Sequence, residues 1–123
     1  MGCGDVMSVS AFSDVVRARV MARSGGFCEV RVNGCWDEAS QLHHRRPRGL
    51  GGSRNPSTGQ ASNALNVCLP CHNHLETAER AESRDRGWLV RQGSDPREVP
   101  VFRYRRWVLL DDEGGITPVE AQS

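Results

Sequence analysis

The first clear hydrophobic pattern along the chain is helical. It predicts a helix that begins at Ser13-Asp14 and ends at Gly25-Gly26. Arginines stand between its apolar positions, which are Val15, Val16, Ala18, Val20 and Met21. This amphipathic pattern favours a surface helix that packs one side on the rest of the domain.

Shorter apolar runs follow, separated by turn residues. They predict strands at residues 39–44, 65–69, 88–90 and 101–110, and a helix from Pro70-Cys71 to about Arg86. Asn33-Gly34 indicates a tight turn. Residues 45–62 are polar and are predicted as one long loop, with a disordered start at 1–12 and a flexible tail at 116–123. The pattern predicts a small α+β fold, as one domain over residues 13–115 with an N-terminal helix and C-terminal strands.

Composition limits how this fold is stabilised. The chain has 123 residues, of which 37% are apolar and 6% aromatic. A core this small often needs a metal, a disulfide or a partner. Trp36, Trp88 and Trp107 are expected in that core. No apolar stretch is long enough to cross a membrane and no secretory signal is recognisable, so we expect a cytoplasmic protein without a membrane partner.

The charges are unevenly distributed. All 16 basic residues are arginines, and residues 17–106 hold all of them against 9 acidic residues, a difference of +7. A basic centre suits a polyanion such as nucleic acid. A genome that prefers arginine codons would explain the missing lysines, but it would not explain the excess of positive charge.

Four of the five cysteines form two pairs, Cys28-x6-Cys35 and Cys68-x2-Cys71. In a reducing compartment such pairs bind metal more often than they form disulfides. We therefore predict a structural Zn²⁺ site with four thiolate ligands. A redox Cys-x-x-Cys is the alternative, but no βαβ pattern surrounds it.

The four histidines, His43, His44, His72 and His74, lie in or beside the cysteine-framed region. Residues 42–52 read Leu-His-His-Arg-Arg-Pro-Arg-Gly-Leu-Gly-Gly, and residues 63–72 read Asn-Ala-Leu-Asn-Val-Cys-Leu-Pro-Cys-His. Over roughly residues 27–80 the chain resembles the HNH endonuclease family, in particular the small cysteine-containing HNH proteins of tailed actinobacterial phages.

The resemblance implies a ββα-metal, treble-clef-like core stapled by the four-cysteine zinc site. Matched by position, His43 and His72 would be ligands of a separate catalytic divalent ion. His44 would be the general base and Asn63 the middle residue of the motif. An alternative is that His72 replaces a cysteine at the zinc site.

The chemistry suits these residue types. Neighbouring residues on a strand point to opposite sides, so His43 could face the ion while His44 faces the attacking water. An imidazole that titrates near neutral pH can take a proton from that water. The amide of Asn63 has both a donor and an acceptor, so it can tie the loop backbone and orient His44.

The third ligand of the ion departs from the family pattern. Glu76 stands four residues after His72, on the same helical face, whereas His74 points away. We predict Glu76 as a ligand, with water or His74 as alternatives. The ion itself is left open between Mg²⁺, Mn²⁺, Ni²⁺ and Zn²⁺.

An arginine cluster without acids follows the histidine pair, and its guanidinium groups suit phosphate. We predict contacts with the DNA backbone, although a solvated loop is the alternative, for Arg45, Arg46, Arg48 and Arg54. Three more arginines could extend this footprint or simply decorate an edge strand: Arg103, Arg105 and Arg106.

The predicted function is metal-dependent hydrolysis of DNA phosphodiester bonds. The resemblance implies a role in phage DNA packaging inside the infected host cell, beside the terminase large subunit and the portal. Two alternatives stay open: a non-catalytic zinc-containing DNA-binding module, and a homing or restriction nuclease.

Overall fold

The computed structural model describes residues 12–47, 56–77 and 80–119. The first element is helix α1 (Asp14–Ser24), where the sequence predicts it. The Ser13 hydroxyl accepts a hydrogen bond from the Val16 N–H at 3.2 Å. Gly25 ends the helix with a φ of 67° and donates to the carbonyl of Met21. These caps satisfy backbone groups that the helix leaves free.

A two-stranded antiparallel hairpin, β1 (Gln41–His44) and β2 (Ala64–Val67), occupies the middle of the molecule. Its register places His43 opposite Leu65. Residues 45–62 were predicted as one loop, which is wrong for the part from Pro56 onward. Residues 56–63 form two short 3-10 helices, η1 (Pro56–Gly59) and η2 (Ala61–Asn63), because local hydrogen bonds fold this polar segment against the hairpin.

The predicted helix after Pro70 is two helices, α2 (Leu69–Thr77) and α3 (Arg80–Asp85). His74 Nε2 lies 3.2 Å from Glu82 Oε1. In a straight helix, residues eight apart are separated by about 12 Å along the axis, so this contact requires α3 to turn back toward α2. The sequence pattern did not show this bend.

A second sheet has the order β3-β4-β5, from β3 (Val101–Arg103), β4 (Arg106–Leu110) and β5 (Ile116–Pro118). The single strand predicted over residues 101–110 is therefore a hairpin. The tail predicted as flexible begins with a paired strand. Residues 88–90 are buried but form no strand, because their N–H groups donate to the carbonyls of Ser83 and Arg45. A 3-10 helix, η3 (Pro96–Glu98), precedes β3.

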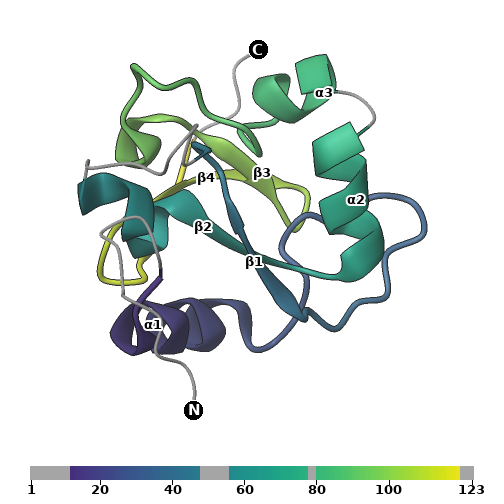
Figure 1. The fold of residues 1–123 in the computed structure, drawn as a ribbon, viewed down its shortest axis with the longest axis horizontal. Helices are drawn as coiled ribbons and strands as arrows, with labels where there is room; N and C mark the ends of the chain where they lie inside the picture. The colour runs from purple at the N-terminus through teal and green to yellow at the C-terminus, as the bar shows by residue number, and fades with distance from the viewer. Residues whose placement is uncertain (1–11, 48–55, 78–79, 120–123) are drawn as a thin grey trace, which may run out of the picture.

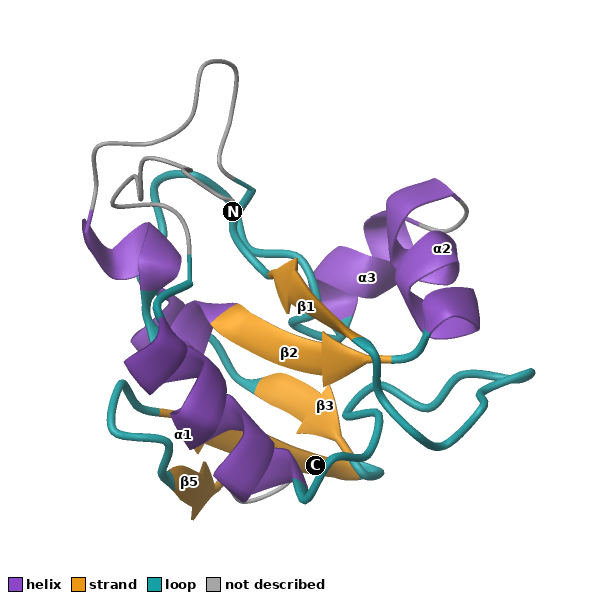
Figure 2. Cartoon of the chain, turned by 60° about the horizontal axis from the view of Figure 1, so that its bottom comes forward, coloured by secondary structure: helices purple, strands orange, loops and turns teal. Residues whose placement is uncertain are grey.

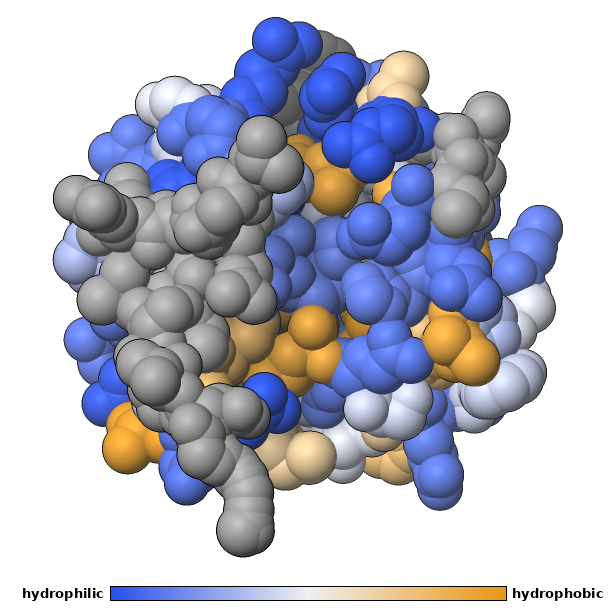
Figure 3. All heavy atoms as spheres, in the orientation of Figure 1, coloured by the Kyte–Doolittle hydropathy of each residue, from blue (hydrophilic) through white to orange (hydrophobic). Residues whose placement is uncertain are grey.

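Helix α1 and helix α2 lie on different sides of the β1–β2 hairpin, and the second sheet lies behind it (Figures 1 and 2). The larger hydrophobic core joins the hairpin, α2 and the second sheet, and includes Leu65, Leu75 and Trp88. A smaller core under α1 includes Phe12, Val16 and Val20. Where Figure 3 colours the face seen in Figure 1, the surface is mostly hydrophilic, with small hydrophobic areas between the polar side chains.

Two expectations about burial are wrong. Trp36 is 64% exposed, because residues 36–38 run along the surface rather than over the core. Phe12 was placed in the disordered start but is 4% exposed, because its ring packs in the smaller core. Residues 1–11 and 120–123 lie outside the described residues. The helices of the described residues are too short and too polar to cross a membrane.

Candidate metal sites and their surroundings

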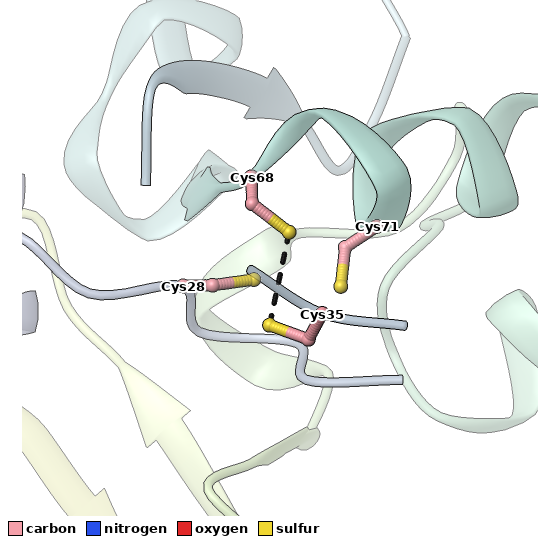
Figure 4. A group of neighbouring side chains, drawn as sticks. All are labelled: Cys28, Cys35, Cys68 and Cys71. Carbon is pink, nitrogen blue, oxygen red and sulfur yellow. Dashed lines mark hydrogen bonds between the residues drawn. The ribbon is translucent and has the colours of Figure 1, made fainter. Parts of the chain in front are cut away.

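The four paired cysteines meet at one point, as the sequence predicts (Figure 4). Cys28 and Cys35 come from the segment after α1, which we call the knuckle (residues 27–38), and the Asn33-Gly34 turn brings them together. Cys68 follows β2 and Cys71 lies in the first turn of α2. The cluster therefore ties the knuckle to the junction of the hairpin and its helix.

The sulfur geometry suits a metal ion better than a disulfide. Cys35 Sγ and Cys68 Sγ are 3.7 Å apart. A disulfide needs about 2.05 Å, whereas two thiolates of a tetrahedral metal site lie roughly 3.8 Å apart. Backbone N–H groups of Trp36 and Asp37 donate to Cys68 Sγ and Cys35 Sγ, at 3.4 and 3.3 Å. The cluster could hold a structural metal ion.

For two thiols of the cluster, Cys35 and Cys71, ionisation is unfavourable without a cation. Burial raises the pKa of Cys35 to about 11 and also raises the pKa of Cys71. Burial opposes the Cys68 thiolate as well, but hydrogen bonds from the backbone of Trp36 and Cys71 bring its pKa below the usual value. A metal ion would displace the thiol protons, so binding would release protons and stabilise the fold.

A second group of possible ligands lies between β1 and α2. His43 from the strand and His72 and Glu76 from the helix have ligand atoms within 4.8 Å of one another. Glu76 Oε2 is 3.5 Å from His43 Nδ1 and 3.6 Å from His72 Nε2. We call these three residues the triad. The structure therefore brings Glu76 to the two histidines, as the spacing of four residues on one helix predicts.

Partners outside the triad orient both imidazoles. His43 Nε2 lies 2.9 Å from the carbonyl oxygen of Trp88, which can only accept a hydrogen bond. His72 Nδ1 is hydrogen-bonded to the side-chain oxygen of Gln41. Each ring therefore carries a proton on its outward nitrogen and turns the other nitrogen toward Glu76. This arrangement is typical of metal-binding histidines.

The charge state of the triad also suits a cation. The side-chain contact with His43 lowers the pKa of Glu76, so its carboxylate is negative at neutral pH. Burial, together with the nearby His43, lowers the pKa of His72 and favours its neutral form. Ligands of a tetrahedral ion with bonds of about 2.1 Å lie roughly 3.4 Å apart, close to the separations observed here. The side chain of Glu76 is 51% exposed, so the triad is open to solvent on that side.

His44 and His43 belong to opposite faces of β1. The His44 ring stacks on Phe12, with centroids 4.0 Å apart and the planes at 17°. Leu42, two residues earlier, packs on the same core, whereas Gln41 and His43 turn toward α2. The strand alternation predicted from sequence is thus present. It also places His44 on the side of Phe12 rather than in the triad.

Asn63 ties the connection between the strands. Its side-chain oxygen accepts from the Arg46 N–H at 2.7 Å. Its amide donates to the carbonyls of Thr58 and Arg46, at 2.8 and 3.1 Å. All three bonds lie within the segment that follows His44, and Asn63 is fully buried. The residue holds the loop backbone, as its amide chemistry predicts.

Two of the four arginines predicted to bind DNA are structural instead. Arg45 is 0% exposed and its guanidinium donates to four carbonyls, those of Ser62, Gly87, Pro96 and Val99. Burial lowers its pKa to about 9, which leaves it charged at neutral pH. Arg46 is 3% exposed and donates to the carbonyl of Ser94 and the hydroxyls of Ser57 and Thr58.

These two predictions were wrong because both side chains turn inward at the end of the hairpin, where the tertiary fold supplies carbonyl and hydroxyl partners. Arg48 and Arg54 lie outside the described residues. Gln41 and the Trp88 carbonyl are functional partners that sequence reasoning missed. The alternation of residues along β1 could have identified Gln41, since it lies two positions before His43 on the same face. No sequence signal identifies the carbonyl.

Comparisons of the chain with models of known protein families, with curated proteins and with solved structures found no match.

Proposed function

We propose that this protein is a metal-dependent endonuclease of the HNH type that hydrolyses phosphodiester bonds in DNA. The observation that carries the proposal is the triad. The imidazoles of His43 and His72 are hydrogen-bonded on their outward nitrogens, and their other nitrogens face the solvent-exposed carboxylate of Glu76. The order of strand, strand and helix around it matches the ββα-metal core implied by the sequence resemblance. That resemblance extends the proposal to phage DNA packaging, with the terminase large subunit and portal as partners.

His43, His72 and Glu76 would hold the divalent ion. When bound, such an ion stabilises negative charge on the phosphate and on the departing oxygen. The mixed donor set of two nitrogens and one carboxylate oxygen is compatible with Mn²⁺, Ni²⁺ or Zn²⁺, and the carboxylate also admits Mg²⁺. Gln41 and the Trp88 carbonyl keep the two rings oriented, so little rearrangement is needed for binding.

His44 is the proposed general base that takes a proton from the attacking water. It is the last residue of β1, so a phosphodiester across the end of the strand would have the triad on one side and His44 on the other. Phe12 fixes the plane of the His44 ring. Asn63 fixes the backbone that follows it.

Plasmid nicking tests the proposal, with each of the four divalent ions added in turn. The wild-type chain should nick DNA only when an ion is present. His44→Ala should lower the rate about 100- to 10,000-fold, the usual loss for a positioned base. His72→Ala should abolish metal-stimulated activity.

His74→Ala is the matched control for the nicking assay. His74 lies on the same helix but contacts Glu82 rather than the triad, so its variant should stay within a few-fold of wild type. Activity of His44→Ala within a few-fold of wild type would remove His44 from the mechanism. A wild-type chain without activity in every ion would contradict the nuclease proposal.

We also propose that the four-cysteine cluster binds one Zn²⁺ that stabilises the fold. Cys68→Ser should unfold or aggregate the chain, because metal binding contributes directly to folding in small domains. Elemental analysis should find one tightly held zinc per wild-type chain. Cys3→Ser, outside the paired cysteines, is the control. A folded, zinc-free Cys68→Ser variant would show that the metal is not structural.

A non-catalytic DNA-binding module is the second candidate. One observation favours it, namely that His44 stacks on Phe12 and belongs to the strand face away from the triad. The nicking assay separates the two functions, since such a module would bind DNA but would not cut it with any ion.

A further inference from the structure

A cavity of about 410 Å³ lies on the other side of α2 from the triad. His72 and Glu76 face the triad, whereas His74 lines the cavity. Residues two apart on a helix point in nearly opposite directions. The other walls come from knuckle residues 30–33, from the end of α3 and from the β3–β4 hairpin. Among the lining residues only Trp88 has a part in the proposed nuclease site, through the bond of its carbonyl to His43.

The cavity walls carry unbalanced positive charge. Arg31 is paired with Asp37, and Glu82 is paired with His74. Arg86 and Arg105 also line the cavity, and neither has an acidic partner within the described part of the chain. Two cations from separate elements therefore face one space with no carboxylate bound to them. Such an arrangement favours an anionic ligand.

Arg86 is held in a defined orientation. Its guanidinium lies over the Phe102 ring, 4.5 Å from the centroid. A guanidinium stacked on a ring keeps its N–H groups in its own plane, where they remain able to donate. The planar fork of arginine matches two oxygens of a phosphate group. Arg86 is therefore pre-oriented for a phosphate without a bond to any protein carboxylate.

Arg105 stands in a backbone conformation that an arginine rarely adopts. It is the second residue of the two-residue turn between β3 and β4, with φ of 64°, after Tyr104 with φ of 49°. Turns with positive φ at both positions strongly prefer Asn-Gly. Strained positions cluster at binding and catalytic sites, where the surrounding structure holds them in place. Here the strained turn presents Arg105 to the cavity.

We propose that this cavity binds a phosphate of the nucleic-acid backbone through Arg86 and Arg105. The inference rests on the proposed function, because the triad would hold another phosphate of the same substrate on the opposite side of α2. A helix with its side chains is roughly 10–12 Å across. A phosphate on each side of α2 would seat the substrate across this helix and fix its register at the triad.

Fluorescence anisotropy with a labelled DNA duplex, over a series of salt concentrations and without added divalent ions, tests the site. Each phosphate contact contributes about 0.9 to the slope of log affinity against log salt. The slope is negative, and Arg86→Gln and Arg105→Gly should each make it shallower by about 0.9. The double variant should make it shallower by about 1.8. Arg84→Gln and Arg106→Thr are matched controls. Both remove one charge from an exposed arginine beside the site that does not line the cavity.

Thermal unfolding separates loss of binding from loss of fold. Glycine adopts a positive φ without strain, so Arg105→Gly should melt at or above the wild-type temperature while its salt slope falls. Equal slopes for Arg105→Gly and Arg106→Thr would overturn the site. Competition with inorganic phosphate gives a further arm: if free phosphate binds through Arg86 but the DNA slope is unchanged, the cavity takes a small anion and the proposal is wrong.

The cavity and the nuclease can fail separately. If the wild-type chain cuts DNA but the site and control variants have the same salt slope, the nuclease proposal is supported and the cavity proposal is wrong. If the chain never cuts DNA, but the salt slope becomes shallower only for Arg86→Gln and Arg105→Gly, the nuclease proposal is wrong. The phosphate site is then supported as part of a DNA-binding module.

Discussion

The two histidines of the triad each depend on one neighbour outside it. The Trp88 carbonyl accepts from His43, and Gln41 accepts from His72. Such partners fix which ring nitrogen is free for a metal, and their loss typically costs 10- to 100-fold in metal affinity. Gln41 is the member of this outer set that a side-chain substitution can remove.

We predict that Gln41→Ala weakens divalent-ion binding at the triad by roughly 10- to 100-fold, because His72 loses the acceptor that orients it. Calorimetric titration of the zinc-loaded protein with Mn²⁺ measures the change. Gln92→Ala is the control, since the Gln92 amide donates to the Pro47 carbonyl rather than to a residue of the triad. Unchanged Mn²⁺ affinity in Gln41→Ala would show that His72 is oriented without it.

Arg45 shows how burial changes the role of a residue type. Its four carbonyl acceptors come from η2, from the end of α3 and from the segment around η3. One side chain therefore donates hydrogen bonds to backbone carbonyls of three segments at positions where no β-sheet pairing satisfies them. Each buried acceptor left without a donor costs about 1–3 kcal/mol.

Arg45→Met should accordingly lower the free energy of unfolding by about 3 kcal/mol or more. Urea denaturation of the variant measures this. Arg91→Met, at an exposed position, should stay within about 0.5 kcal/mol of wild type. Equal stabilities of the two variants would contradict the structural role of Arg45.

Among the elements, the connection from α3 to β3 passes closest to its neighbours at Gly87. This residue has φ of 76°, and a Cβ placed there would lie 2.0 Å from the Pro100 carbonyl oxygen. The N–H groups of Trp88 and Leu89 both donate to the Ser83 carbonyl just beyond this point. Only glycine allows the chain to leave α3, turn, and pass beside the start of β3.

Gly87→Ala should therefore destabilise the protein by at least about 2 kcal/mol, because backbone rather than a flexible side chain must move. Gly93→Ala, six residues later, is the control. Its Cβ would meet nothing within 4 Å, so the change should stay within about 0.5 kcal/mol. Midpoints of thermal unfolding compare the two. Similar midpoints would contradict the close approach at Gly87.

At the scale of the whole molecule, one buried acid joins the parts. Glu29 accepts from Arg23 of α1 at 2.7 and 2.8 Å, and from Arg103 of β3 at 2.6 Å. It also accepts from the Asn66 N–H of β2 at 2.8 Å. Glu29 is fully buried, and it belongs to the knuckle next to Cys28. A single carboxylate thus links α1, both sheets and the four-cysteine cluster.

Glu29→Gln should lower the free energy of unfolding by about 3 kcal/mol or more, because it leaves two buried guanidinium groups without their counter-charge. Chemical denaturation measures the loss. Glu38→Gln removes an acid from an exposed position of the same knuckle and should have little effect. A Glu29→Gln variant as stable as Glu38→Gln would show that the carbonyl bonds of Arg23 and Arg103 suffice.

Local chemistry in the sequence determined helix α1 with its caps, the alternation along the strands of the central hairpin and the approach of the two cysteines within each pair. It also determined the approach of Glu76 to His72, whereas the tertiary fold brings His43 to both. Each of these depends on residues a few positions apart: a serine before a helix, alternation along a strand, or a spacing of four on a helix. Their outcome is fixed by backbone geometry before distant segments make contact.

Only the tertiary structure decided the rest, because the deciding partners lie far away in the chain. Arg45 and Arg46 look like phosphate ligands in a polar stretch, yet carbonyls up to 54 residues away take their donors. The apolar run at residues 88–90 is buried without becoming a strand, because the Arg45 carbonyl and the Ser83 carbonyl receive its N–H groups. The turn at Tyr104-Arg105 contains no glycine or asparagine, so the sequence did not indicate a hairpin. Strand pairing and the hydrogen bond from the Tyr104 hydroxyl to the Ser24 carbonyl hold this strained turn instead.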